Sequence, residues 1–411
     1  MDGRSNPDEL EVENVDSRRS RFQLSRHAIT RHAADSNARP LHVVTFGCET
    51  FAEVKPQALG LTYWFDTAAN GKPYPVTIRF AGRRIGVKGK PGPRDRFSVL
   101  ESVDHVVPGS GPIAITTRIF GIAPGEWHVT ATPVGDPRPR PATSRSVPTR
   151  HPSPPKASSS GTTGFAPVIR IRAPGARLGV WPALVGLGAA VALTVQALLA
   201  AHAGLPVTRV LLVSLVASVV GLVGAKLYYL TGRYLGGRRL PSLLTGGMCI
   251  QGFVLGAIGA LVVGAWVVDV PVGALLDVTA PGLLFGMTIG RFGCFLGGCC
   301  AGRPTASRWG LWSSDRHLGM RRIPTQLLES TVALLVGLAA LLAVWTTTPQ
   351  PAGVVFIGAI AAYTLGRQLL FPLRAAPRHT AHGRTLTMAL AGLVVAVAVA
   401  VAAFAKSFPL K

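Results

Sequence analysis

The chain has 411 residues, of which 48% are hydrophobic and only 15% are charged. This excludes a soluble globular protein along its whole length, because such proteins carry about 25% charged residues. The formal net charge is +23, but arginines flank the apolar segments, where they would meet anionic lipid headgroups, so we expect a membrane partner and no nucleic acid. Five cysteines, four of them in the apolar part, do not indicate a disulfide framework.

The N-terminal part of the chain is polar. Residues 1–40 are charged, poor in aromatic residues and without periodicity, which predicts disorder. In residues 41–135, hydrophobic and polar residues alternate around Ile78, Ile115 and Val129, and turn residues separate the runs. This pattern predicts a small all-β, sandwich-like soluble domain, with Asn70-Gly71 as a candidate hairpin turn. No catalytic constellation stands out in this segment, which favours a spacer role.

The rest of the chain divides into a linker and a membrane domain. Residues 136–177 are rich in Pro, Ser and Arg and predict an extended linker. Residues 178–405 contain seven apolar segments near the length of about 20 residues that a membrane helix needs, and they predict an all-α polytopic membrane bundle. The predicted spans lie near 178–201, 207–230, 243–268, 274–300, 326–346, 352–373 and 386–405, followed by a tail at 406–411.

Arginines inside the apolar segments are the strongest chemical signal. Arg291 lies in the glycine-rich stretch GMTIGRFGCFLGGCCAGRPT, which also holds Arg303. An arginine within a membrane costs about 2.5–3.5 kcal/mol on insertion scales. Arg367 and Arg374 are seven residues apart, about two helical turns, so we expect them to share one face of a helix. Guanidinium groups are planar, bidentate donors, so these residues predict a phosphate or carboxylate site. The alternative is that helix-end arginines extend to lipid headgroups.

The motifs of residues 178–405 resemble those of the bacterial prolipoprotein diacylglyceryl transferases in order and spacing. The family's signature loop is matched by Gly290, Arg291, Gly293, Phe295, Gly298, Gly302 and Arg303. Its glycine-rich motif in span three is matched by Gly246, Gly247, Met248, Gly252 and Gly256. Its D-x-x-A-P stretch is matched by Asp277–Pro281, and the motif entering span five by Pro324, Thr325, Gln326, Leu327 and Glu329. Arg367 and Arg374 keep the spacing of the family's arginines in span six.

The resemblance implies a specific activity. The family transfers the diacylglyceryl group of phosphatidylglycerol to the thiol of a lipobox cysteine in a prolipoprotein, and glycerol phosphate leaves. It implies a multi-pass protein of the bacterial plasma membrane that uses no metal and no organic cofactor. Arg291 and Arg367 would then bind phosphate and stabilise charge on the leaving group. The positions matched to substrate binding are Gly247, Gly252, Gly290, Gly293, Gly298, Arg303, Gln326, Glu329 and Arg374.

The chain departs from the family at several polar positions. Gln251 stands where the family has a histidine, and glutamine does not accept a proton at neutral pH. Cys294 and Gly297 replace the asparagines of the signature loop, and Cys299 replaces its glutamate. Either the chemistry is changed, with Gln251 and Cys299 in an altered catalytic set, or the protein binds a phospholipid without turning it over.

The cysteines of the signature loop have three interpretations. Cys294, Cys299 and Cys300 lie within seven residues. They are small packing residues, or one of them is a reactive thiolate beside Arg291, or together with His317 they hold zinc. The C-x4-C-C spacing is not a standard zinc pattern, so we assign no metal ligand among the site residues.

The orientation in the membrane has two conflicting predictions. Lys and Arg concentrate before span one and after spans two, four and six, all on one side of a seven-span protein, and the positive-inside rule makes that side cytoplasmic. The family places its N-terminus and signature loop on the outer side. We adopt the family orientation as the hypothesis for the bundle.

Overall fold

A computed structural model describes residues 40–44, 57–134, 153–165, 173–177, 179–235, 249–375 and 382–407. The chain divides into two compact units. The first comprises the residues up to Ala173 together with His317–Arg321, and the second comprises Pro174–Arg316 and Arg322–Lys411. The predicted disorder at 1–39, much of the predicted linker, the tail from residue 408 and Gly247 fall outside the described residues.

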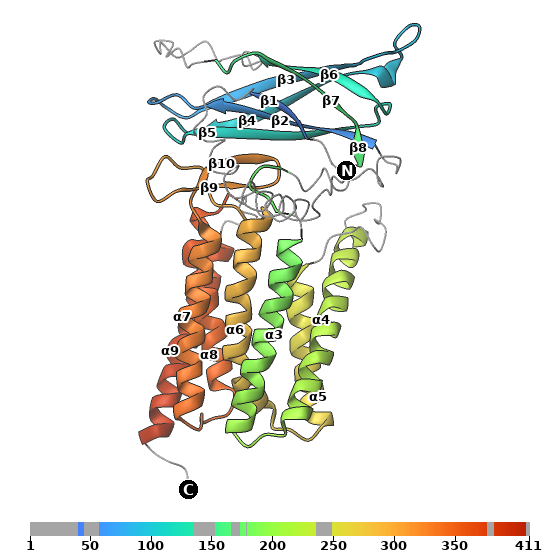
Figure 1. Cartoon of the computed structure of the whole chain (residues 1–411). Helices are drawn as coiled ribbons and strands as arrows, with labels where there is room; N and C mark the ends of the chain where they lie inside the picture. The colour runs from blue at the N-terminus through green and yellow to red at the C-terminus, as the bar shows by residue number, and fades with distance from the viewer. Residues whose placement is uncertain are drawn as a thin grey trace, which may run out of the picture. The chain divides into compact units, whose positions relative to one another are not determined.

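The first unit is built from two antiparallel sheets (Figure 1). In one sheet, the strands of this unit follow the order β1-β2-β5-β10, with β8 also pairing with β2. These strands are β1 (Leu41–Val44), β2 (Gln57–Asp66), β5 (Pro112–Phe120), β8 (Gly164–Phe165) and β10 (Leu318–Arg322). The other follows the order β4-β3-β6-β7, and its strands are β3 (Tyr74–Arg84), β4 (Arg96–Val106), β6 (Glu126–Val134) and β7 (Ala157–Thr162). A short 3-10 helix, η2 (Pro93–Asp95), precedes β4.

A hydrophobic core joins the two sheets of this unit. The alternating residues Ile78, Ile115 and Val129 are fully buried in one cluster, and Trp127 and Tyr63 are its largest fully buried side chains. Residues of both sheets contribute to this cluster, because the period of two in each strand directs every second side chain inward. The all-β, sandwich-like prediction is therefore confirmed.

Three details of this unit differ from the sequence-based expectations. Asn70-Gly71 connects β2 to β3, which belong to different sheets, so it is not a hairpin turn. Strand β7 lies inside the predicted linker, where backbone hydrogen bonds to the edge of β6 stabilise a Ser-rich segment that offers few apolar side chains. Strand β10 comes from the connection between two membrane helices, and it pairs with β5 through Leu318↔Ile115 and Gly319↔Ala114.

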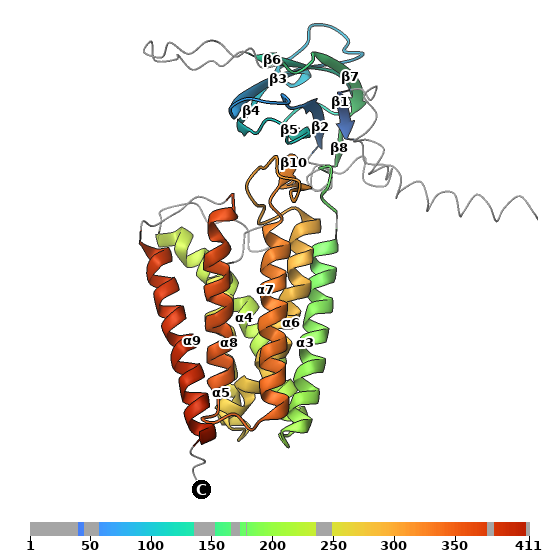
Figure 2. The same ribbon diagram turned by 90° about the vertical axis from the view of Figure 1, so that its left-hand side faces the viewer.

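The second unit is a bundle of seven helices, which confirms the predicted all-α membrane architecture (Figures 1 and 2). The helices are α3 (Val180–His202), α4 (Val207–Leu235), α5 (Ile250–Val267), α6 (Val272–Gly297), α7 (Thr325–Thr346), α8 (Val354–Leu370) and α9 (Gly383–Ser407). Six of them are long and apolar enough to cross a membrane, while α5 has 18 residues and forms a shorter apolar helix. Strand β9 (Leu311–Ser314) lies between α6 and α7.

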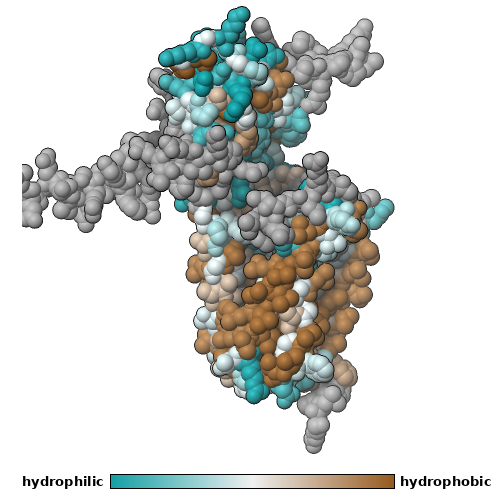
Figure 3. Space-filling model, turned by 90° about the vertical axis from the view of Figure 1, so that its right-hand side faces the viewer, coloured by the Kyte–Doolittle hydropathy of each residue, from teal (hydrophilic) through white to brown (hydrophobic). Residues whose placement is uncertain are grey.

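Glycines bring neighbouring helices into close backbone contact. A Cβ atom on Gly188 of α3 would lie 2.7 Å from the carbonyl oxygen of Gly286 on α6. A Cβ atom on Gly252 of α5 would lie 2.3 Å from the carbonyl oxygen of Gly224 on α4. In lipid the hydrophobic effect gives helices little reason to associate, so such small-residue contacts supply the packing. The face of the helical bundle seen in Figure 3 is largely hydrophobic. Leu222 of α4 is among the exposed apolar side chains of the bundle.

Helix α8 has a defined start and an earlier end than predicted. At its start, Asp277 of α6 is buried and accepts hydrogen bonds from the backbone nitrogens of Gly353 (2.7 Å) and Phe356 (2.9 Å). These donors have no partner within the helix, so the carboxylate caps it. The helix ends at Leu370, and the 3-10 helix η3 (Phe371–Leu373) follows. The expectation that Arg367 and Arg374 share a helix face is therefore wrong, because Pro372 disrupts the regular α-helix before residue 374.

Candidate functional site

The residues singled out from the sequence gather at one end of the bundle. Successive helices run in opposite directions (Figure 1), so the end of α6 lies with the start of α7 and the end of α8. These three segments carry Arg291, Glu329 and Arg367, respectively. The start of α5, which carries Gln251, belongs to the same end.

A buried ionic cluster is the centre of this end. Glu329 has a side chain only 2% exposed, and one of its oxygens lies 2.9 Å from a guanidinium nitrogen of Arg291. Its other oxygen accepts a hydrogen bond of 3.0 Å from Arg374. Arg291 also donates a hydrogen bond of 3.1 Å to the hydroxyl of Tyr363, a buried residue of α8. One carboxylate thus holds two arginines together.

This cluster is not electrically balanced. Two guanidinium groups against one carboxylate leave one net positive charge. In the part of the chain that the structure describes, the buried Nε of Arg374 has no hydrogen-bond partner. A buried donor without a partner costs about 1–3 kcal/mol, and more when it is charged. The cluster therefore has both the charge and a free donor to bind an anionic group.

The loop after α6 is fixed by backbone contacts around the cluster. Gly298 ends α6 with φ +69°, a left-handed conformation that glycine adopts without strain. Gln326, at the start of α7, donates a 2.8 Å hydrogen bond to the carbonyl oxygen of Cys299. Arg303 binds the segment around Arg374, since its backbone nitrogen bonds to the carbonyl of Leu373 at 2.9 Å. The arginine-bearing ends of α6 and η3 are thereby held next to the start of α7.

The remaining predicted residues have different surroundings. Gln251 is exposed, and its side-chain oxygen accepts a hydrogen bond of 2.8 Å from the thiol of Cys249. Gly293 packs against α3, where its Cβ would lie 3.4 Å from Leu184, whereas a Cβ on Gly290 would meet nothing within 4 Å. Among the described residues, the side chain of Arg367 makes no hydrogen bond or ion pair.

Three thiols lie together beside the ionic cluster. The sulfur atoms of Cys294, Cys299 and Cys300 are all within 4.8 Å of one another. Cys294 and Cys299 are half-buried and Cys300 is exposed. Hydrogen bonds from the two other thiols, with the positive charges of Arg374 and Arg291, lower the pKa of Cys300.

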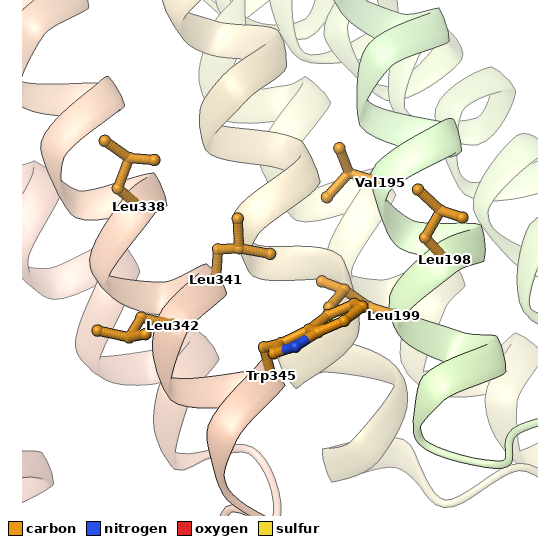
Figure 4. Close-up of a pocket in the computed structure, with 7 residues that line it drawn as sticks. All are labelled: Val195, Leu198, Leu199, Leu338, Leu341, Leu342 and Trp345. Carbon is orange, nitrogen blue, oxygen red and sulfur yellow. The ribbon is translucent and has the colours of Figure 1, made fainter.

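An apolar cavity lies toward the opposite end of the bundle (Figure 4). It has a volume of about 580 Å³ and is lined between α3 and α7 by Val195, Leu198, Leu199, Leu338, Leu341, Leu342 and Trp345. Trp345 stacks on His202 with a centroid distance of 4.3 Å. A hydrocarbon lining suits an acyl chain or a lipid tail and offers nothing to a phosphate. The ionic cluster, not this cavity, is the candidate site.

Sequence comparison assigns the bundle to a known family. A family profile for prolipoprotein diacylglyceryl transferase matches residues 169–406, more than half of the chain. The chain belongs to this family. The match covers all seven helices of the bundle and therefore includes the ionic cluster, which makes the cluster part of the domain that defines prolipoprotein diacylglyceryl transferases.

Curated members of the prolipoprotein diacylglyceryl transferase family match part of the chain. It is 35% identical over 193 residues to the phosphatidylglycerol–prolipoprotein diacylglyceryl transferase 2 of Streptomyces coelicolor, covering 42% of this chain and 59% of the relative. It is 33% identical over 143 residues to the enzyme of that name from Acaryochloris marina, covering 33% and 52%. It is 28% identical over 171 residues to the one from Clostridium tetani, covering 40% and 68%. The chain thus spans between half and about two thirds of the length of these relatives.

One member of the cluster was missed by sequence reasoning. Tyr363 lies four residues before Arg367 on α8, and a tyrosine in an apolar helix gives no signal of its own. A helical wheel would have placed it one turn from Arg367 on the same face. That proximity is the only sequence signal that points to it.

Proposed function

We propose that this protein is a diacylglyceryl transferase of the bacterial plasma membrane that acts on phosphatidylglycerol and a prolipoprotein cysteine. The observation that carries the proposal is the buried cluster in which Glu329 holds Arg291 and Arg374 together. A cluster with one net positive charge in a membrane domain matches the single negative charge of a phosphodiester. The family and the names of the curated relatives support the same substrate class.

The arginines have a direct role in the proposed reaction. The acceptor thiolate attacks the glycerol carbon that bears the diacylglyceryl group, a carbon–sulfur bond forms, and the carbon–oxygen bond to the phosphate breaks. Glycerol phosphate leaves with one additional negative charge on its oxygen. Arg291 and Arg374, prearranged by Glu329, stabilise that charge without reorganising, and Arg367 supplies a further guanidinium that forms no bond among the described residues.

A second candidate function is phospholipid binding without turnover. Gln251 favours it, because this side chain is exposed and hydrogen-bonded to Cys249, and an amide does not accept the proton of an incoming thiol. In this case the cluster would retain an anionic lipid, and no thioether would form. The two candidates share the binding step and differ only in the chemical step.

Purified full-length protein in vesicles that contain phosphatidylglycerol and a lipobox peptide distinguishes the two candidates. Transfer of the diacylglyceryl group is measured by mass spectrometry of the peptide, and retained lipid by extraction from the protein. Transfer supports the enzyme, and retained phosphatidylglycerol without transfer supports the binding protein. Absence of both refutes the proposed site.

Variants of two arginines, one in the ionic cluster and one at the other end of the bundle, test whether the cluster is the site of transfer. Arg291→Ala should lower transfer by at least about 100-fold, the effect of removing one donor to a developing charge. Arg291→Lys should rescue only part of this loss, because lysine lacks the bidentate fork. Arg209, which binds the carbonyl of Val268 at the other end of the bundle, provides the matched control. An equal loss for Arg209→Ala would show a defect of the fold instead of the site.

A further inference from the structure

The thiols of Cys294, Cys299 and Cys300 lie close together, which the spacing of these cysteines in the sequence did not predict. Cys294 is on the last turn of α6, and Gly298 then turns the chain back, so that the backbone nitrogen of Cys299 bonds to the carbonyl oxygen of Cys294 at 3.0 Å. This turn brings all three sulfur atoms within 4.8 Å of one another. The fourth described cysteine, Cys249, lies at the start of α5 and is hydrogen-bonded to Gln251.

The backbone of the third cysteine is strained. Cys300 has φ +56°, in the left-handed region that residues other than glycine rarely adopt. This conformation costs a non-glycine residue about 1–2 kcal/mol. Such strain concentrates at functional sites, where a side chain must be held in one direction. Here it places the thiol of Cys300 beside those of Cys294 and Cys299.

The spacing of the sulfur atoms suits a soft metal ion. Zinc binds thiolate at about 2.3 Å, so tetrahedral geometry requires sulfur atoms about 3.8 Å apart. The observed upper limit of 4.8 Å is within reach of small side-chain rotations. Three ligands leave the fourth position of a tetrahedral ion open, as in catalytic zinc sites.

The charge of the surroundings selects between the soft metal ions. Three thiolates with a divalent ion carry one net negative charge, whereas with a monovalent ion such as Cu⁺ they carry two. The cluster of Arg291, Arg374 and Glu329 carries one net positive charge. A divalent ion therefore leaves less uncompensated charge on the thiolate group than a monovalent ion does, which matters because uncompensated charge is costly at the edge of a membrane.

We propose that Cys294, Cys299 and Cys300 bind one Zn²⁺ ion through three thiolates and leave its fourth position open. The site is separate from the anion-binding role of the arginines, and its existence does not rest on the proposed transferase activity.

The open position has a use if the proposed transferase function holds. An acceptor thiol that binds there loses its proton to solvent as the sulfur–zinc bond forms, because a thiol coordinated to zinc is deprotonated. The resulting thiolate then forms the carbon–sulfur bond while glycerol phosphate leaves. A zinc ion would thereby perform the deprotonation for which Gln251 is unsuited.

Metal binding is tested on the reduced full-length protein in detergent. Zn²⁺ is added, excess ion is removed, and the ratio of zinc to protein is measured by elemental analysis. We expect one ion per chain, retained in Cys249→Ser and lost in Cys300→Ser. Loss of one thiolate should weaken binding by more than the roughly 10–100-fold that loss of a supporting partner costs. Co²⁺ should give a thiolate-to-metal charge-transfer band that disappears in the same variant.

Unmodified protein provides a second test that does not depend on the folding of a variant. Bound Zn²⁺ should slow alkylation of Cys294, Cys299 and Cys300, measured by peptide mass spectrometry, and leave Cys249 unaffected. Equal alkylation with and without Zn²⁺ would overturn the proposal. A disulfide among the three cysteines, with no bound metal in protein from cells, would overturn it as well. If the protein binds Zn²⁺ but transfers no diacylglyceryl group, the proposed transferase activity is refuted and the proposed zinc site stands.

Discussion

Removal of the charge of Glu329 is the sharpest test of the buried cluster. Glu329→Gln keeps the volume of the side chain and one oxygen acceptor, but it leaves Arg291 and Arg374 without a counter-charge. Their side chains are 14% and 10% exposed, so water does not compensate them fully. Breaking a buried ion pair by removing one partner costs about 3–5 kcal/mol, and the retained amide favours the lower end, about 3 kcal/mol.

This loss of stability is large enough to measure directly. A loss of 1 kcal/mol lowers the melting temperature of a domain of this size by about 2–4 °C, so Glu329→Gln should lower the apparent midpoint by about 6–12 °C. The assay is thermal unfolding of the full-length protein in one detergent, followed by intrinsic fluorescence. Glu126→Gln, at an exposed position of β6, is the control and should leave the midpoint unchanged within about 1–2 °C.

A double variant checks the cause of the effect. Glu329→Gln combined with Arg374→Gln reduces the uncompensated charge from two to one, so the double variant should lose less stability than the sum of the two single variants. A coupling of about 1–3 kcal/mol is expected for residues in direct contact. Additive losses, or a midpoint for Glu329→Gln equal to that of the unaltered protein, would refute the idea that one carboxylate holds the two arginines.

Three further substitutions test the packing that supports the site. Gly188→Ala should cost about 1–3 kcal/mol by forcing α3 from α6, whereas Gly186→Ala, with open space around its Cβ on the same helix, should be neutral or slightly stabilising in thermal unfolding. Asp277→Ala should cost about 2–4 kcal/mol by leaving two backbone donors of α8 unpaired, measured by the same assay. Trp127→Ala should cost about 3–5 kcal/mol in the β-domain, measured by near-ultraviolet circular dichroism, and should leave zinc binding unchanged.

The sequence was sufficient to predict the two architectures, because strands and membrane helices both leave a regular pattern of hydrophobic residues. Alternation around Ile78, Ile115 and Val129 predicts inward-facing strands, and the long apolar segments predict the helices. It was insufficient for β7, since a Ser-rich edge strand is stabilised by backbone bonds that leave no hydrophobic pattern. It was also insufficient for β10, because a strand contributed from 200 residues further along the chain leaves no local trace of its partner.

The sequence predicted the residues of the site, but not the contacts between them. Arg291, Glu329 and Arg374 were each identified from the sequence, but their shared contacts depend on how three helix ends meet. The pairing of Arg367 with Arg374 was expected from their spacing, and it fails because Pro372 ends the regular helix between them. The three thiols come together only through the left-handed turn at Gly298, which residue spacing does not encode.

The pairing of β5 with β10 has a consequence for how often the chain crosses the bilayer. Two strands that exchange hydrogen bonds must be in the same aqueous compartment, and β5 precedes α3 whereas β10 follows α6. The number of crossings between them must therefore be even. Length and composition alone identify α3, α4 and α6, an odd number. Helix α5, whose 18 residues extend about 27 Å, is thus required to cross as well.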